Sequence, residues 1–252
     1  MIKGSTKNSI IYSLVGVAVV FALWFLLYFV VADAYLIPSP IEVIKASFLN
    51  FASSEFYLHL LNTLKRVLLA LLISFVLGVT LAIFSSLNAK FEGVMLTIIS
   101  ILRSLPVFAV LLIILVFVLR TNVPVVVCVL SLFPIVYSQT LTYLSTIDPK
   151  QKQMLKLYKV PLKKQITSVY LKGYLPLFLK QLGESFSFAL KLIVSAEILA
   201  SVYKSICGDM SAAYDATNVT ALFSLTLIIC LLGVVVELIG KLISSKMERK
   251  YQ

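Results

Sequence analysis

Charged residues are scarce in this chain. Asp, Glu, Lys and Arg make up 13% of its 252 residues, about half of the fraction that is usual in soluble domains. Hydrophobic residues make up 60%, and the mean hydropathy is +1.03. Several apolar runs reach about twenty residues, the length that crosses a bilayer as a helix. These features exclude a soluble globular domain and predict an all-α membrane protein, because helices satisfy their backbone hydrogen bonds within lipid.

The residues and motifs of common enzymes are also missing. The chain has a single histidine, His59, and lacks the HExxH and GxSxG motifs. It lacks the phosphate-binding motif GxxxxGK[ST], so ATP-driven work requires a separate ATPase subunit. Cys128, Cys207 and Cys230 show neither CxxC nor metal-ligand spacing. We therefore expect no catalytic residue, cofactor or metal in this chain; an intramembrane enzyme that uses His59 is an alternative.

Acidic residues are few compared with basic ones. The chain has 11 Asp and Glu against 22 Lys and Arg, which gives a net charge of +11. In a soluble protein this balance would indicate nucleic-acid binding. Here the basic residues lie between apolar spans, as the positive-inside rule predicts, so we expect a lipid bilayer and no nucleic acid as partner.

The apolar runs predict six membrane spans with both termini in the cytoplasm. Lys3 and Lys7 precede the first span and basic residues follow the last one, which favours this orientation. Arg66, with its neighbour Lys65, lies near the outer end of the second span and is an exception to the rule. A signal peptide cleaved near Ala32 is an alternative, although the apolar stretch is longer than usual for such peptides. The spans cover about residues 10–32, 63–86, 94–119, 125–144, 182–202 and 219–243.

Several local patterns lie within and between these spans. The sequence Ile37–Pro40 precedes a short surface helix, and residues 203–218 form an outer loop. Arg103–Pro106 interrupts the third span, because an arginine and a proline are costly in lipid. Small residues four apart in the second span form a packing face: Ala70, Ser74, Gly78, Ala82 and Ser86.

Ionisable and polar residues inside spans are the candidates for a translocation path. A charge near the middle of the bilayer is costly and persists when it is paired or hydrated. Structural pairing, for example between Glu184 and Lys191, or snorkelling to the interface is an alternative that weighs equally. The candidate path residues are Lys191, Ser195, Glu197, Arg103 and Tyr137.

Residues 148–180 form the one long polar stretch, rich in lysine, and the topology places it in the cytoplasm. Apolar residues recur there at helical spacing, first at Met154, Leu157 and Tyr158 and again after Pro161. This pattern predicts two short amphipathic helices hinged near Pro161. An apolar face in water indicates a docking surface for a partner protein.

A series of motifs resembles a known family. They are Leu36-Ile37-Pro38-Ser39-Pro40, Leu102-Arg103-Ser104-Leu105-Pro106, Phe133-Pro134-Ile135, Tyr170-Leu171 with Leu175-Pro176, and Ser195-Ala196-Glu197-Ile198. In this order they resemble the permease subunit of binding-protein-dependent ABC importers, in the branch for sulfonates, taurine, nitrate and pyrimidine precursors. The resemblance implies a type I ABC importer permease fold, with a single transmembrane domain over residues 1–252 and a family-like core over about 36–245.

The resemblance further implies that the cytoplasmic stretch holds a coupling helix that enters a cleft on an ATPase. Counting back from Pro176 places Gln153, Met154 and Leu155 at the family's Glu-Ala-Ala positions and Lys159 at its glycine, so none of the four matches. The ATPase-coupling residues would be Gln153, Met154, Leu155, Lys156, Leu157, Tyr158, Lys159 and Pro161.

The implied partners are ABC ATPase subunits that bind ATP and Mg, an extracytoplasmic solute-binding protein and a second permease chain, by default an identical one. The implied location is the bacterial inner membrane, and the implied cargo is a small polar or anionic solute. A stand-alone secondary transporter or channel driven by an ion gradient is the alternative, although the sequence shows no inverted repeat.

Overall fold

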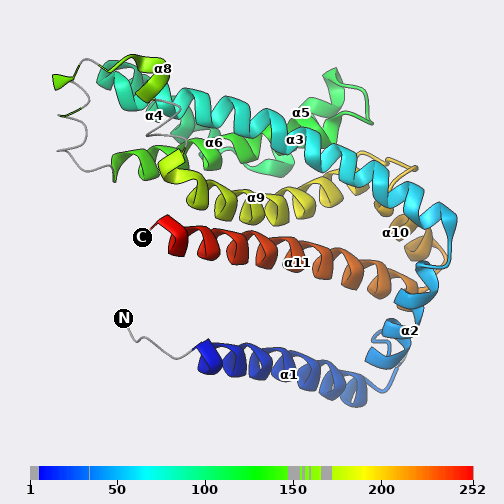
Figure 1. Ribbon diagram of the computed structural model, residues 1–252. Coiled ribbons are helices and arrows are strands. Elements are labelled where there is room, and N and C mark those ends of the chain that lie inside the picture. The colour runs from blue at the N-terminus through cyan, green and yellow to red at the C-terminus, as the bar shows by residue number, and fades with distance from the viewer. Residues whose placement is uncertain are drawn as a thin grey trace. The chain divides into compact units, whose positions relative to one another are not determined.

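The computed structural model describes residues 6–33, 35–146, 154, 157, 158, 160–165 and 172–251. Within these residues the regular structure is helical and contains no strand, which confirms the all-α fold (Figure 1). The helices are α1 (Thr6–Val31), α2 (Pro40–Asn50), α3 (Ser54–Leu87), α4 (Ala89–Ser104), α5 (Val107–Phe117), α6 (Val123–Ser145), α8 (Leu162–Gln165), α9 (Lys172–Leu199), α10 (Ile206–Asp215) and α11 (Val219–Tyr251).

Three of the described helices are long and apolar enough to cross a membrane by themselves: α3, α6 and residues 219–247 of α11. The pair α4 and α5 passes the same test together, which gives up to four spans by length and composition. Residues 15–31 of α1 form a shorter apolar helix. Membrane-spanning helices are therefore present, while the number six stays a prediction.

The interruption expected at Arg103–Pro106 is a bend of 93° between α4 and α5. α4 ends at Ser104, and Leu105 is extended, with φ −72° and ψ 127°. A residue before proline is kept from the helical region by the proline ring, and Pro106 then precedes the first residue of α5. The sequence thus ends one helix and begins another within a single apolar run.

The contacts within the chain define two compact units, and the prediction of a single domain stays untested. One unit contains residues up to Tyr57 together with 209–228; the other contains 58–208 together with 229–252. In the first unit Ser39 caps α2 by accepting a hydrogen bond from the Ile41 amide (3.3 Å). Asn50 Nδ2 donates to Ser224 Oγ (3.0 Å), which attaches the expected short helix after Pro40 to α11.

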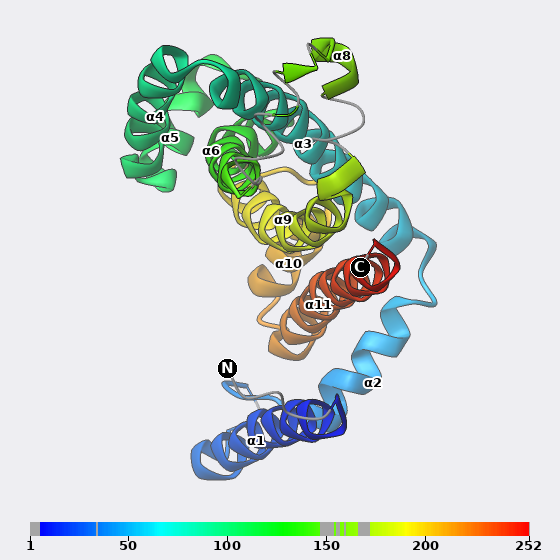
Figure 2. The same cartoon turned by 60° about the vertical axis from the view of Figure 1, so that its left-hand side comes forward.

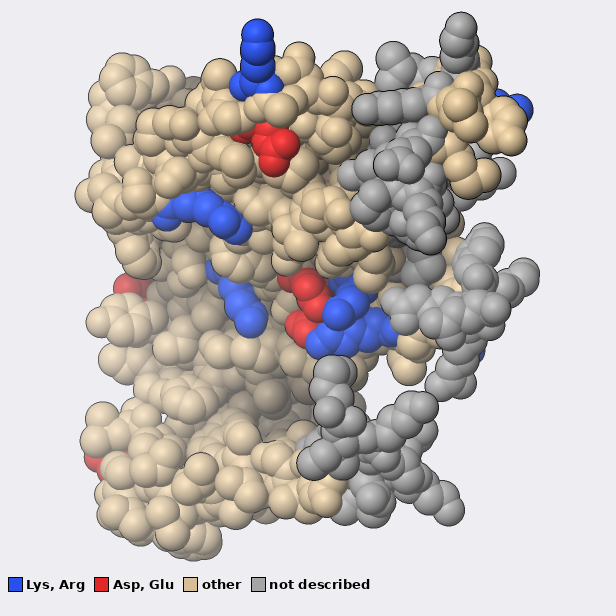
Figure 3. Space-filling view, turned by 90° about the vertical axis from the view of Figure 1, so that its left-hand side faces the viewer, with Lys and Arg blue, Asp and Glu red and all other residues tan. Residues whose placement is uncertain are grey.

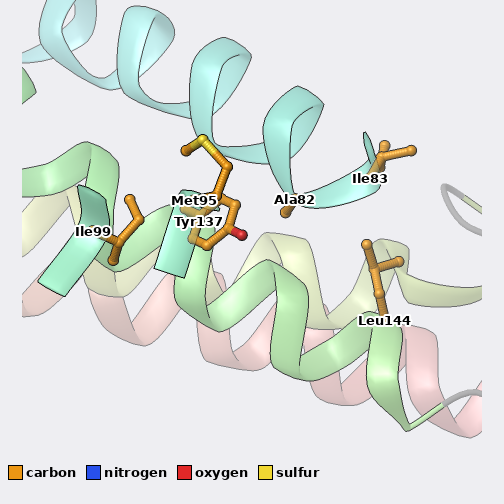
Figure 4. Packing of buried hydrophobic residues seen from close by; sticks show 6 residues of the cluster. All are labelled: Ala82, Ile83, Met95, Ile99, Tyr137 and Leu144. Atoms are coloured by element: carbon orange, nitrogen blue, oxygen red, sulfur yellow. The ribbon is translucent and has the colours of Figure 1, made fainter. Parts of the chain in front are cut away.

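The second unit is built around α6 and α9, which lie side by side in both ribbon views (Figures 1 and 2). One core cluster joins α3, α4 and α6 (Figure 4). Tyr137 lies in this cluster, and its hydroxyl is 2.8 Å from Ser85 Oγ. The cluster consists of Ala82, Ile83, Met95, Ile99, Tyr137 and Leu144.

Two of the small residues of α3, Gly78 and Ala82, lie where this helix approaches α6. Ala70, Ser74, Gly78 and Ala82 are buried, whereas Ser86 is half-buried. A Cβ atom added to Gly78 would come within 2.7 Å of Val136 Cγ1, so α3 and α6 are in closer contact there than a larger residue permits.

Several boundaries differ from the sequence expectations. α3 begins at Ser54, well before residue 63; α9 begins at Lys172, so residues 172–180 are helical and not part of a loop. α10 occupies much of the expected outer loop. Its first turn is buried at Ile206 and Cys207, so packing in the second unit stabilises the start of a helix that is too short to be stable by itself.

Candidate coupling surface and buried polar cluster

The described part of the cytoplasmic stretch exposes apolar side chains. Met154 is 56% exposed, Leu157 78% and Tyr158 71%. The Tyr158 amide donates to the Met154 carbonyl (2.9 Å), which forms one helical turn. Residues three and four apart share a face of such a turn, so these three side chains form one apolar surface. The other predicted coupling residues before Pro161, namely Gln153, Leu155, Lys156 and Lys159, lie outside the described residues.

Pro161 separates this turn from α8. The amides of Lys164 and Gln165 both donate to the Pro161 carbonyl (2.9 and 3.0 Å), so a new helical turn begins at the proline. Gln165 Nε2 donates to the Val160 carbonyl (2.7 Å), a bond that links α8 to the residue before Pro161. A hinge near Pro161 was expected, and a change of helix occurs there; the second apolar block after Gln165 falls on residues that are not described.

The charged residues that the structure describes within residues 148–180 are lysines. Lys164 on α8 and Lys180 on α9 are exposed. Figure 3 shows a mostly uncharged face on which Lys and Arg side chains lie together with some Asp and Glu side chains. An apolar face flanked by lysines suits a socket that is apolar with an acidic rim.

The predicted path residues of α9 lie on two different faces. Lys191 and Ser195 are exposed, and Ser195 Oγ donates to the Lys191 carbonyl (3.0 Å). Glu197 is fully buried. The suggested ion pair between Glu184 and Lys191 does not occur in the described part of α9, where Glu184 is half-buried and Lys191 is exposed.

Glu197 is held by two residues of α3. Its Oε1 accepts a hydrogen bond from Arg66 Nη1 (2.7 Å), and its Oε2 accepts one from Thr63 Oγ1 (3.0 Å). The Glu197 side chain has no exposed surface, and that of Arg66 is only 16% exposed. We call Glu197, Arg66 and Thr63 the Glu197 cluster. A carboxylate without solvent requires such partners, because an unpaired buried charge is strongly destabilising.

The Glu197 cluster extends to two further segments. Arg66 Nε donates to the carbonyl of Thr121, which lies between α5 and α6 (3.2 Å). Thr63 Oγ1 accepts a hydrogen bond from the Ile206 amide, the first residue of α10 (3.3 Å). The cluster therefore joins α3 to the end of α9, the start of α10 and the segment before α6.

Sequence reasoning named Glu197 but not its partners. Thr63 carried no signal, because a threonine at the start of a span is common. Arg66 did carry one, since it contradicted the charge rule for the outer side. The remaining path candidates are separate from the cluster: Arg103 is exposed in the last turn of α4, and Tyr137 is buried in the α3–α4–α6 core. Their part in a path stays a prediction.

Comparisons with known proteins concern the family and the fold of the chain. The sequence model of one protein family, described as the binding-protein-dependent transport system inner membrane component, matches residues 74–249. The structure is similar to a crystal structure of an amino acid ABC transporter with histidines, with a TM-score of 0.61 and 18% identity over 83% of this chain and 97% of that chain. At this identity the likeness shows the fold alone. A search of curated protein sequences finds no match.

Proposed function

The chain belongs to the family of inner membrane components of binding-protein-dependent transport systems, and from this premise we propose that it is the permease subunit of an ABC importer for a small polar or anionic solute. As a member of this family it is a membrane protein of an ABC transporter, which implies ATPase and binding-protein partners. Our proposal adds the direction of transport, the kind of solute and the way in which the chain is coupled to its ATPase.

The exposed apolar turn in the cytoplasmic stretch supports the coupling role most strongly. Met154, Leu157 and Tyr158 lie on one face and are mostly exposed. Apolar side chains on a water-facing loop are unfavourable unless a partner covers them. We propose that this turn enters a cleft on the ATPase, that ATP and Mg bind in that partner, and that Gln153–Lys159 and Pro161 make the contact.

Other features of the proposed complex follow from the arrangement of a two-site ATPase. One chain offers one such turn, so two ATPase subunits require two permease chains, and an identical pair is the simplest assembly. We propose six spans per chain with both termini in the cytoplasm of a bacterial cell. The exposed pair Lys191 and Ser195 on α9 is the best candidate for contact with the solute, since an ammonium group and a hydroxyl suit an anion such as a sulfonate or nitrate.

The coupling role is tested by removing the apolar character of the turn. Leu157→Glu/Tyr158→Glu places two carboxylates where the ATPase cleft would receive apolar groups. We expect normal amounts of the chain in the membrane and at least a tenfold loss of the co-expressed ATPase after purification through a tag on the permease, because docking would bury two charges without partners.

The matched control is Leu157→Met/Tyr158→Phe, which keeps the size and apolar character of both side chains. This variant should retain the ATPase as well as the unmodified chain does. Full retention of the ATPase by the two-glutamate variant would show that the turn is not the docking surface.

A further inference from the structure

The α9 helix connects the cytoplasmic stretch with the Glu197 cluster. It runs without interruption from Lys172 to Leu199, and at 1.5 Å per residue its 28 residues cover about 42 Å. The hydrocarbon core of a bilayer is about 30 Å thick. One continuous helix thus begins within the cytoplasmic stretch and ends at the cluster.

The main chain of Glu197 also takes part in the turn that ends α9. Its carbonyl accepts a hydrogen bond from the Val202 amide (3.0 Å), while Ser201 between them has a φ of 52°. This six-residue closure with a left-handed residue is the Schellman motif that terminates helices. The main chain of Glu197 therefore closes the turn from α9 to α10, and its side chain attaches that turn to α3.

The contacts of Glu197 exclude a direct role in binding the solute in this conformation. Both carboxylate oxygens accept hydrogen bonds from the chain itself, and the residue has no exposed surface. A second link between the same segments lies beside it, where Asn62 Nδ2 donates to the Lys204 carbonyl (3.3 Å). These contacts fit a residue that positions helices and not one that contacts cargo.

We propose that Glu197 is a positioning residue of the transport cycle: through Arg66 and Thr63 it fastens the α9–α10 turn to α3, so that α9 transmits movement between this turn and the cytoplasmic stretch. Without the attachment, the end of α9 moves independently of α3, and movement of the turn is no longer transmitted to the cytoplasmic stretch. This inference rests on the proposed function, because it assumes that one end of α9 faces a binding protein and the other an ATPase.

A crosslinking experiment tests the attachment without requiring transport. Cysteines replace Asn62 and Lys204, and Ser replaces Cys230, since Cys230 is exposed while Cys128 and Cys207 are buried. Oxidation in membrane vesicles should join the two segments rapidly. In a Glu197→Gln background we expect the rate to fall by about fivefold, because the turn then opens locally more often.

A second measurement tests transmission in the intact complex with its ATPase. The readout is the ratio of ATP hydrolysis with and without the binding protein, purified from its host with its own ligand bound. We expect Glu197→Gln to lower the stimulated ratio by at least about fivefold, the lower end of typical coupling between sites, while hydrolysis without the binding protein is unchanged. Glu184→Gln, which removes a half-buried acid of α9 outside the cluster, is the matched control and should change neither readout.

Thr63→Val is the second variant, because it keeps the shape of the side chain and removes only the hydroxyl that links Glu197 to the Ile206 amide. If the Glu197→Gln variant does not assemble, both measurements are made with Thr63→Val instead. Unchanged crosslinking overturns the attachment, and slower crosslinking with an unchanged stimulation ratio overturns the role in transmission. If the unmodified complex shows no stimulation at all, the proposed function fails, whereas the crosslinking rates still decide whether the cluster holds the turn.

Discussion

Gly78 provides a direct test of how closely α3 and α6 pack. In Gly78→Ala the new Cβ would lie 2.7 Å from Val136 Cγ1, 2.9 Å from Val136 Cβ and 3.0 Å from the Tyr137 amide nitrogen. Carbon atoms in contact normally lie about 3.5–4.0 Å apart. Neither the branched Val136 side chain nor the main chain of α6 can turn aside, so the helices must separate, at a cost of about 1–3 kcal/mol.

The matched control is Gly93→Ala, because a Cβ at Gly93 in α4 meets nothing within 4 Å. Both variants gain the same helix propensity, roughly 1 kcal/mol, so the difference between them isolates the overlap. We expect Gly78→Ala to be less stable than Gly93→Ala by about 1–3 kcal/mol, measured as the free energy of unfolding in a titration with sodium dodecyl sulfate in micelles. Equal stabilities would show that α3 and α6 do not pack through Gly78 in the way described.

Two further predictions concern buried polar pairs. Arg66→Met should lower the free energy of unfolding by about 3–5 kcal/mol, because Glu197 is left buried without its cation. Arg66→Met/Glu197→Met should be much closer in stability to the unmodified protein. If the single variant is as stable as the double variant, this prediction is wrong. Tyr137→Phe should lower the free energy of unfolding by about 1–3 kcal/mol, because the buried Ser85 hydroxyl loses its partner. Ser85→Ala/Tyr137→Phe should recover most of that loss in the same titration. If the effects of the two single substitutions simply add, the prediction is wrong.

Patterns with a local physical cause were predictable from the sequence. The prolines at 38 and 40 and the cap at Ser39 determine where α2 begins, since each acts on its immediate neighbours. The interruption before Pro106 is of the same kind, because the proline ring acts on the residue before it. The size of the bend is not local: the 93° angle depends on what each helix packs against, and no nearby residue specifies it.

Features that depend on tertiary contacts were not predictable. α10 has only ten residues, and the burial of its first turn is visible only in the fold. The extra helical residues of α3 before residue 63 are similar, because Phe56 is buried there against neighbours that are known only from the fold. The proposed coupling surface was predictable only in part. The helical spacing of Met154, Leu157 and Tyr158 is visible in the sequence, whereas a single chain does not show which partner would cover these residues.

Arg66 shows how an exception to a topology rule contains structural information. The positive-inside rule counts Lys and Arg in short loops and near the ends of spans. Arg66 is largely buried against a fully buried acid, so a pairing inside the protein accounts for its position in the chain. An arginine that contradicts the charge pattern is therefore a reason to search the other spans for an acid of similar depth. In this chain that search leads from the second predicted span to the fifth, where Glu197 is the one acid near the outer end.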